Sequence, residues 1–155
     1  TAIHNNIPEF WNRKKVYEYM GFDRFISVDE FKNPFYFGSW ISDADMMSKI
    51  KHTLEENEDK NQMIFAVTVQ NHAPYYVPRG VEEIKVEGDL SAEDKDMLSR
   101  YATGVKISDN DLYELYKYIE KRDYFITKTL FYAECTIKKK ENIYTKHALC
   151  CVLAK

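Results

Sequence analysis

One apolar run, residues 63–69, limits the fold more than any other part of the chain. It reads Met-Ile-Phe-Ala-Val-Thr-Val, a composition typical of a strand buried on both faces of a sheet. The run ends in a polar turn, residues 70–75, that contains His72 and Pro74. Ligands in open α/β sheets bind just beyond the carboxyl ends of the strands, so His72 is a candidate site residue. The alternative is a loop histidine with no role in binding.

The segments around this strand alternate between strand and helix patterns. Residues 1–3 favour a strand, and a short helix is expected from an Asn12 cap to Gly21 in the left-handed conformation. Residues 22–36 are aromatic-rich and broken by a proline, which predicts an irregular segment with room for one short strand. A second helix is expected from Ser42, with a capping-box-like start and an apolar stripe of Met46, Met47, Ile50 and Leu54.

Two further helices are predicted downstream. The first begins at Ser91, and the second begins at Ser108 with Asp111 at its third position and one face made of Leu112, Leu115, Tyr116 and Ile119. The order strand, helix, strand, helix, helix predicts an α/β fold with a mainly parallel sheet.

Length and charge narrow the function classes. A chain of 155 residues has the length of a single domain. Its net charge of −3 lacks the excess of positive charge that is typical of nucleic-acid-binding proteins. No apolar run reaches the roughly 18 residues that a membrane span needs. The chain starts at Thr1, within the first expected strand. We therefore expect a cut end there, which makes missing targeting signals uninformative about a parent protein.

The composition changes near residue 121. Residues 1–120 carry 14 Lys and Arg against 22 Asp and Glu, whereas residues 121–155 carry 8 against 3. This basic tail holds Cys135, Cys150 and Cys151, whose spacing lacks the C-x-x-C pairs of zinc sites and favours free thiols. It reads as two alternating strands, about 124–137 and 143–153. An edge hairpin, a basic patch and a tail foreign to the domain, from a truncated or frame-shifted gene, remain open.

A second motif, His4 followed by Phe10-Trp11-Asn12-Arg13, gives the turn at His72 a context. This motif resembles the lipoteichoic acid synthase family. The resemblance extends to Val16-Tyr17, Met20 to Phe25, Ser42 to Met46, Asn71-His72-Ala73-Pro74-Tyr75 and residues 101–119. Members of this family are sulfatase-like phosphoglycerol transferases of the alkaline phosphatase superfamily. The resemblance covers residues 1–120 and implies part of a three-layer αβα sandwich, with 121–155 as a divergent tail.

The resemblance implies a role for four residues. In that family the residues matching His4, Trp11, Arg13 and His72 line the pocket for the glycerol-phosphate head group. The residue types suit this task, since a guanidinium binds two phosphate oxygens and an imidazole donates to others. An indole supplies an apolar wall. From spacing alone, Arg13 could equally be a surface arginine and Trp11 a core residue.

The family's reaction also implies groups that this sequence does not supply. It uses a divalent metal, manganese or a similar ion, held by carboxylates, a histidine and a nucleophilic threonine. The segment with the threonine is expected upstream of Thr1, and where a Gly-Asp-His motif should follow Ile119 the chain reads Tyr-Phe-Ile-Thr-Lys-Thr-Leu, residues 124–130. We therefore expect no catalytic residue, no metal ligand and no bound cofactor in this chain, and no activity of the chain alone.

The leading expectation is a piece of a membrane-anchored, extracytoplasmic phosphoglycerol transferase or a related sulfatase-type enzyme. Its partner would be an anionic phospholipid head group, such as that of phosphatidylglycerol, or another phosphate or sulfate ester. The membrane would be reached only through other segments of the parent, and this chain alone would be soluble. The alternatives are a stand-alone binding domain without catalysis, or a piece of a sulfatase or phosphoethanolamine transferase.

Overall fold

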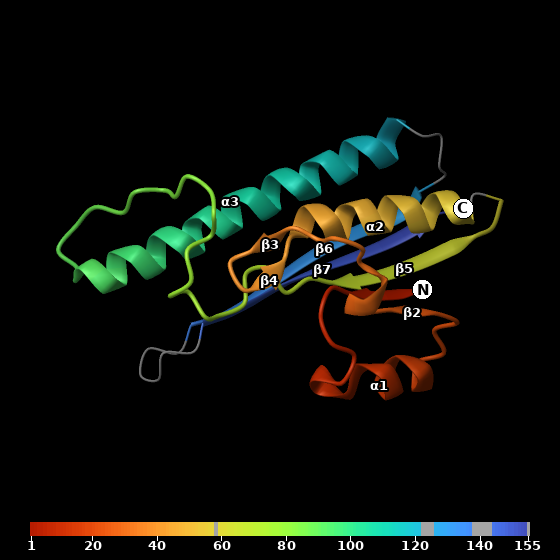
Figure 1. Ribbon diagram of the computed structural model, residues 1–155. Coiled ribbons are helices and arrows are strands. Elements are labelled where there is room, and N and C mark those ends of the chain that lie inside the picture. Colours follow the sequence, from red (N-terminus) through yellow and green to blue (C-terminus); the bar gives the residue numbers. More distant parts are fainter. Residues whose placement is uncertain (58, 122–125, 138–143, 155) are drawn as a thin grey trace.

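A five-stranded sheet forms the centre of the molecule in the computed structural model, which describes residues 1–57, 59–121, 126–137 and 144–154. The strand order is β2-β1-β5-β7-β6 (Figure 1). The bounds are Ala2–His4 for β1, Phe25–Ile26 for β2, Gln62–Val67 for β5, Ile126–Ile137 for β6 and Tyr144–Ala154 for β7.

The first strand lies between two partners that run parallel to it. Ile3 is opposite Ile26 of β2 and Ala66 of β5, and His4 is opposite Val67. The expected strands at 1–3 and 63–69 are thus confirmed to within two residues. Because β1 and β5 are parallel, their carboxyl ends meet at one edge of the sheet, where His4 and the turn after β5 come together.

Helices cover both faces of the sheet, which confirms a partial three-layer αβα arrangement (Figure 1). Helices α2, Asp43–Glu56, and α3, Ala92–Lys121, share one face, and α1, Arg13–Tyr19, lies on the other. Leu115 and Ile119 of α3 are buried in one core with the predicted α2 stripe, Met46, Met47, Ile50 and Leu54, and with Ile3 and Ile64. Under the sheet, the Tyr17 ring packs edge-on against Phe22, Phe25 and Phe65.

The segment before α2 is built from short pieces, but it holds three short strands where the sequence predicted room for one. It contains β2, a 3-10 turn η2 at Val28–Glu30, and a hairpin of β3, Tyr36–Phe37, with β4, Trp40–Ile41. The start of α2 is also as expected. The Ser42 hydroxyl accepts from the Asp45 N–H at 3.1 Å and donates to the Asp45 carboxylate at 2.6 Å.

The expected cap of α1 is wrong. Asn12 belongs to a 3-10 turn, η1 at Phe10–Asn12, and its side chain makes no capping hydrogen bond because its backbone is left-handed, with φ 53°. An N-cap needs an extended backbone to turn its side chain toward the first helical N–H groups. Gly21 ends the helical segment with φ 79°, as predicted.

The prediction of two helices after residue 91 is also wrong. One helix, α3, runs from Ala92 to Lys121, so Ser108 and Asp111 are interior positions. Gly104 and Ser108 imitate a helix end and a new cap in the sequence. In the structure both are explained by contacts with the turn after β5, described below.

The tail strands β6 and β7 pair antiparallel with each other, and β7 pairs antiparallel with β5. The sheet is therefore parallel on the β2-β1-β5 side and antiparallel on the tail side. The 138–143 connection and the side chains of the three cysteines lie outside the described part of the structure. The domain boundary at residue 120 and the basic patch stay predictions. Among the described residues, no helix combines the length and apolar character required to span a bilayer.

Candidate functional site

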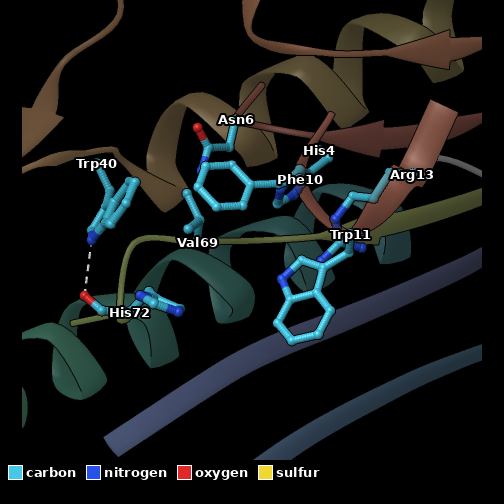
Figure 2. A pocket seen from close by; sticks show the side chains of 8 residues that line it. All are labelled: His4, Asn6, Phe10, Trp11, Arg13, Trp40, Val69 and His72. Carbon is cyan, nitrogen blue, oxygen red and sulfur yellow. Dashed lines mark hydrogen bonds between the residues drawn. The ribbon is translucent and has the colours of Figure 1, made fainter. Parts of the chain in front are cut away.

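A pocket of about 430 Å³ opens at the edge of the sheet where β1 and β5 end. Its lining residues are His4, Asn6, Phe10, Trp11, Arg13, Trp40, Val69 and His72, so all four sequence-predicted site residues come together. Figure 2 shows His4, Trp11 and Arg13 on one side and Trp40 and His72 on the other. Within the described part of the chain the lining set contains a guanidinium and two imidazoles but no carboxylate, a composition that favours an anion.

His4 is the last residue of β1 and is buried, with 2% of its surface exposed. Its Nδ1 lies 2.7 Å from the carbonyl oxygen of Val67 on the neighbouring strand. A carbonyl can only accept, so Nδ1 carries the hydrogen. The next residue, Asn5, accepts from the Val69 N–H at 3.1 Å and donates to the Ile41 carbonyl at 2.9 Å. Asn5 thereby joins the ends of three strands below the pocket.

The turn η1 brings Trp11 and Arg13 to the pocket. Trp11 has φ 58° and keeps 75% of its side chain exposed, so it does not pack in the core. A left-handed aromatic residue is unusual and costs of order 1–3 kcal/mol. The Arg13 guanidinium donates from Nη1 to the Tyr17 hydroxyl at 2.8 Å. Its buried Nε has no acceptor in the described part of the chain.

His72 is held by its backbone on both sides. Its N–H donates to the Val69 carbonyl at 2.9 Å, and its carbonyl accepts from the Trp40 indole at 2.9 Å (Figure 2). Its Nδ1 donates to the Ala73 carbonyl at 2.6 Å. The rings of His72 and Trp40 meet edge to face, 5.6 Å apart. In both histidines of the pocket, Nδ1 therefore faces a backbone carbonyl.

Sequence reasoning missed four lining residues: Asn6, Phe10, Trp40 and Val69. Trp40 is the most informative of them, because its indole fixes the turn that carries His72. It lies in the irregular segment before α2, where no periodicity marks it. A lone tryptophan two residues before a helix cap was the available signal.

A buried polar network lies behind the turn. The Asp43 carboxylate at the start of α2 is fully buried and accepts from the Ser108 hydroxyl at 2.5 Å. The pKa of Asp43 is raised to about 6, chiefly because burial disfavours the charged form, while hydrogen bonds from Ser108 and Thr68 oppose this shift and the charge of Asp111 adds to it. The Asp43 N–H donates to the Gln70 side chain at 2.7 Å. The network thus ties α2 and α3 to residues 70 and 71.

The metal-binding potential of the chain is low in its described part. No group of three or more His, Cys, Asp or Glu side chains there is arranged to hold a metal ion. His52 of α2 is exposed and lies 3.4 Å from Glu56 one helical turn away. The site that the structure assembles is therefore suited to binding an anion through nitrogen donors.

Comparisons with known proteins place this geometry in a family. The sulfatase family model matches residues 1–133. The chain is 40% identical over 123 residues to a Rhizobium meliloti protein named "Putative cyclic beta-1,2-glucan modification protein", covering 79% of this chain and 19% of that protein. It is 31% identical over 113 residues to the lipoteichoic acid synthase-like protein YvgJ of Bacillus subtilis, covering 72% and 18%. The chain thus spans about a fifth of the length of these curated relatives.

Solved structures agree with the family assignment. The lipoteichoic acid synthase LtaP from Listeria monocytogenes superimposes with a TM-score of 0.59 at 30% identity, over 77% of this chain and 29% of that one. A protein in the alkaline phosphatase superfamily from Vibrio parahaemolyticus gives a TM-score of 0.62 over 96% of this chain and 37% of that one; at 23% identity it supports the fold alone. The chain belongs to the sulfatase family and is similar to lipoteichoic acid synthase-like proteins.

Proposed function

We propose that this chain carries the phosphate-binding side of a phosphoglycerol transferase site and binds the glycerol-phosphate head group of an anionic phospholipid. The observation that supports this most directly is the convergence of His4, Trp11, Arg13 and His72 on one pocket of about 430 Å³. These residues come from three separate segments of the sequence. The volume lies in the range of small-molecule sites, roughly 300–1,000 Å³.

Each residue type has a defined task in this proposal. Arg13 is charged at any physiological pH, and its guanidinium offers two parallel N–H donors to a phosphate. His4 and His72, each with Nδ1 committed to a carbonyl, bring Nε2 as the atom that donates to a phosphate oxygen when protonated. The rings of Trp11 and Trp40 are suited to contact the glycerol carbons, since an indole combines an apolar face with one polar N–H.

Binding is the whole of the proposed function, and no chemical step is assigned to this chain. Members of the alkaline phosphatase superfamily generally use a divalent metal, but the described residues provide no group that fits one. We infer that the chain alone is inactive, and that metal and nucleophile belong to other segments of a longer, extracytoplasmic protein anchored in the membrane.

The direct test is a titration of glycerol-1-phosphate into the folded chain and into Arg13→Ala. We expect a loss of about 1.5–3 kcal/mol in binding, roughly 10- to 150-fold in Kd, because a charge-assisted contact is removed. Lys14→Ala is the matched control. Lys14 is next to Arg13 and carries the same charge, but its side chain is exposed and does not line the pocket. Equal affinities for the two variants would exclude a specific phosphate contact by Arg13.

A second candidate concerns the acceptor of the transferred group. The Rhizobium relative is named for modification of a cyclic glucan, which suggests a glucan as the acceptor of the longer protein. Phosphoethanolamine and sulfate esters remain alternative donors that share the same anion chemistry. Competition by phosphoethanolamine, by sulfate and by a β-1,2-glucan against bound glycerol-1-phosphate separates these classes.

A further inference from the structure

We propose that Ser108 is a positioning residue for His72: its hydroxyl fixes the turn after β5 to α2 and α3, and so sets where the imidazole meets a phosphate ligand. This inference rests on the proposed function for the identity of the ligand. Ser108 lies in the interior of α3 and does not line the pocket. It acts through the turn rather than by contact with the ligand.

The hydroxyl of Ser108 uses all of its hydrogen-bonding capacity. It donates to the Asp43 carboxylate at 2.5 Å and accepts from the Asn71 and Gln70 side-chain amides at 2.7 and 3.1 Å. A hydroxyl has one hydrogen and two lone pairs, so no other residue type of this size completes the same three contacts. All four residues are buried, with at most 8% of their surfaces exposed. Loss of any partner would leave buried polar groups unsatisfied.

The contacts with Ser108 end one residue before His72. The Asn71 carbonyl accepts from the Tyr75 hydroxyl at 2.8 Å, and the His72 N–H donates to Val69. The Gln70 side chain is held from its other end by the Asp43 N–H at 2.7 Å. Residues 70 and 71 are therefore fixed from the helix side, while Trp40 fixes the His72 carbonyl from the hairpin side. The backbone that carries the imidazole is therefore held from two directions.

Gly104 shows how closely α3 approaches this turn. A Cβ atom at Gly104 would overlap the Asn71 Oδ1 atom and would approach the Phe37 ring at 3.4 Å. A glycine in a helix interior costs about 1 kcal/mol relative to alanine. The close approach of Asn71 accounts for its presence here, one helical turn before Ser108.

The test compares Ser108→Ala with Thr53→Val. Thr53 is an equally buried hydroxyl, but it donates only to the Lys49 carbonyl within α2. The readouts are the imidazole nitrogen and proton NMR signals of His72 over a pH titration, and the affinity for inorganic phosphate. We expect Ser108→Ala to change the His72 signals and to weaken phosphate binding about tenfold, the scale typical of supporting contacts. Thr53→Val should lower stability and leave both readouts unchanged.

Three outcomes are informative. A folded Ser108→Ala protein with the His72 signals and phosphate affinity of the wild type would overturn the proposal. If Ser108→Ala does not fold, Gly104→Ala tests the same link, because it displaces Asn71 while adding a better helix former; unchanged His72 signals there would also overturn it. If the wild type does not bind phosphate, the proposed function fails, whereas the His72 signals still decide the positioning role.

Discussion

Asp43 gives this protein an unusual dependence of stability on pH. Its pKa is about 6 in the folded state against an ordinary value of 3.8, so between these values the folded state binds the proton more tightly than the unfolded state. The contribution of this group is therefore most favourable below pH 4 and is lost as the pH rises toward 6. The full effect is about 3 kcal/mol.

Replacement of Asp43 by asparagine should remove this dependence. At pH 4 we expect the free energy of unfolding of Asp43→Asn to be equal to or lower than that of the wild type. As the pH rises to 7, the free energy of unfolding of the variant should increase relative to that of the wild type by up to about 3 kcal/mol. The measurement is the free energy of unfolding in urea at several pH values, with the exposed Asp109→Asn on α3 as the control. A constant difference between Asp43→Asn and the wild type over this range would contradict the raised pKa.

At the scale of an element, the β3–β4 hairpin is held against the site by a buried arginine. Arg79 is 1% exposed, and its guanidinium lies 5.2 Å from the Phe37 ring and 5.3 Å from the Tyr75 ring. Its Nη1 donates to the Phe37 carbonyl at 3.3 Å, and burial lowers the pKa of its guanidinium. These contacts of Arg79 matter for the pocket because the same hairpin carries Trp40, whose indole donates to the His72 carbonyl.

The turn of this hairpin strongly favours glycine. Gly38 has φ +66°, and a Cβ atom there would lie 2.7 Å from Arg79 Nη1. We expect Gly38→Ala to lower stability by about 1–2 kcal/mol more than Gly21→Ala, because overpacking adds to the cost of the left-handed backbone. Gly21 is the matched control, since it has φ +79° and no atom within 4 Å of the added Cβ. Chemical denaturation of both variants measures the difference, and equal losses would mean that Arg79 moves aside freely.

The helices show what sequence patterns can and cannot predict. The apolar stripe of α2 and its Ser42 cap were predictable, since both depend on local spacing. The continuity of α3 was not, because Gly104 and Ser108 are there for a turn more than 30 residues away. Their roles depend on tertiary contacts that override local propensity.

The residues of the pocket show the same contrast between local patterns and tertiary contacts. His4, Trp11, Arg13 and His72 were predictable because short motifs carry them. The left-handed Trp11 and the contact from Trp40 were not, because they depend on how separate segments meet.

At the scale of the whole molecule, nitrogen donors line the pocket, and the described residues include no group arranged to hold a metal ion. We therefore expect added Mn²⁺ to change the affinity for glycerol-1-phosphate by less than about twofold and to support no release of phosphate, since Mn²⁺ prefers oxygen ligands. Calorimetric titration with and without Mn²⁺ measures the first quantity, and a phosphate assay the second. A large gain in affinity with the metal would show that the chain contributes ligands of its own.

The central place of β1 has a consequence for how the chain folds. Its three residues pair with β5 more than 60 positions away, and the hydrogen bond of His4 Nδ1 forms only when Val67 is in place. Such pairings form slowly, because closing a long loop costs chain entropy before the long-range contacts can stabilise the chain. The pairing of β1 with β5 can form only once residues 65–67 are available. The pocket at the ends of β1 and β5 therefore forms only after these two strands have paired, and any ligand that binds there favours molecules in which this pairing is complete.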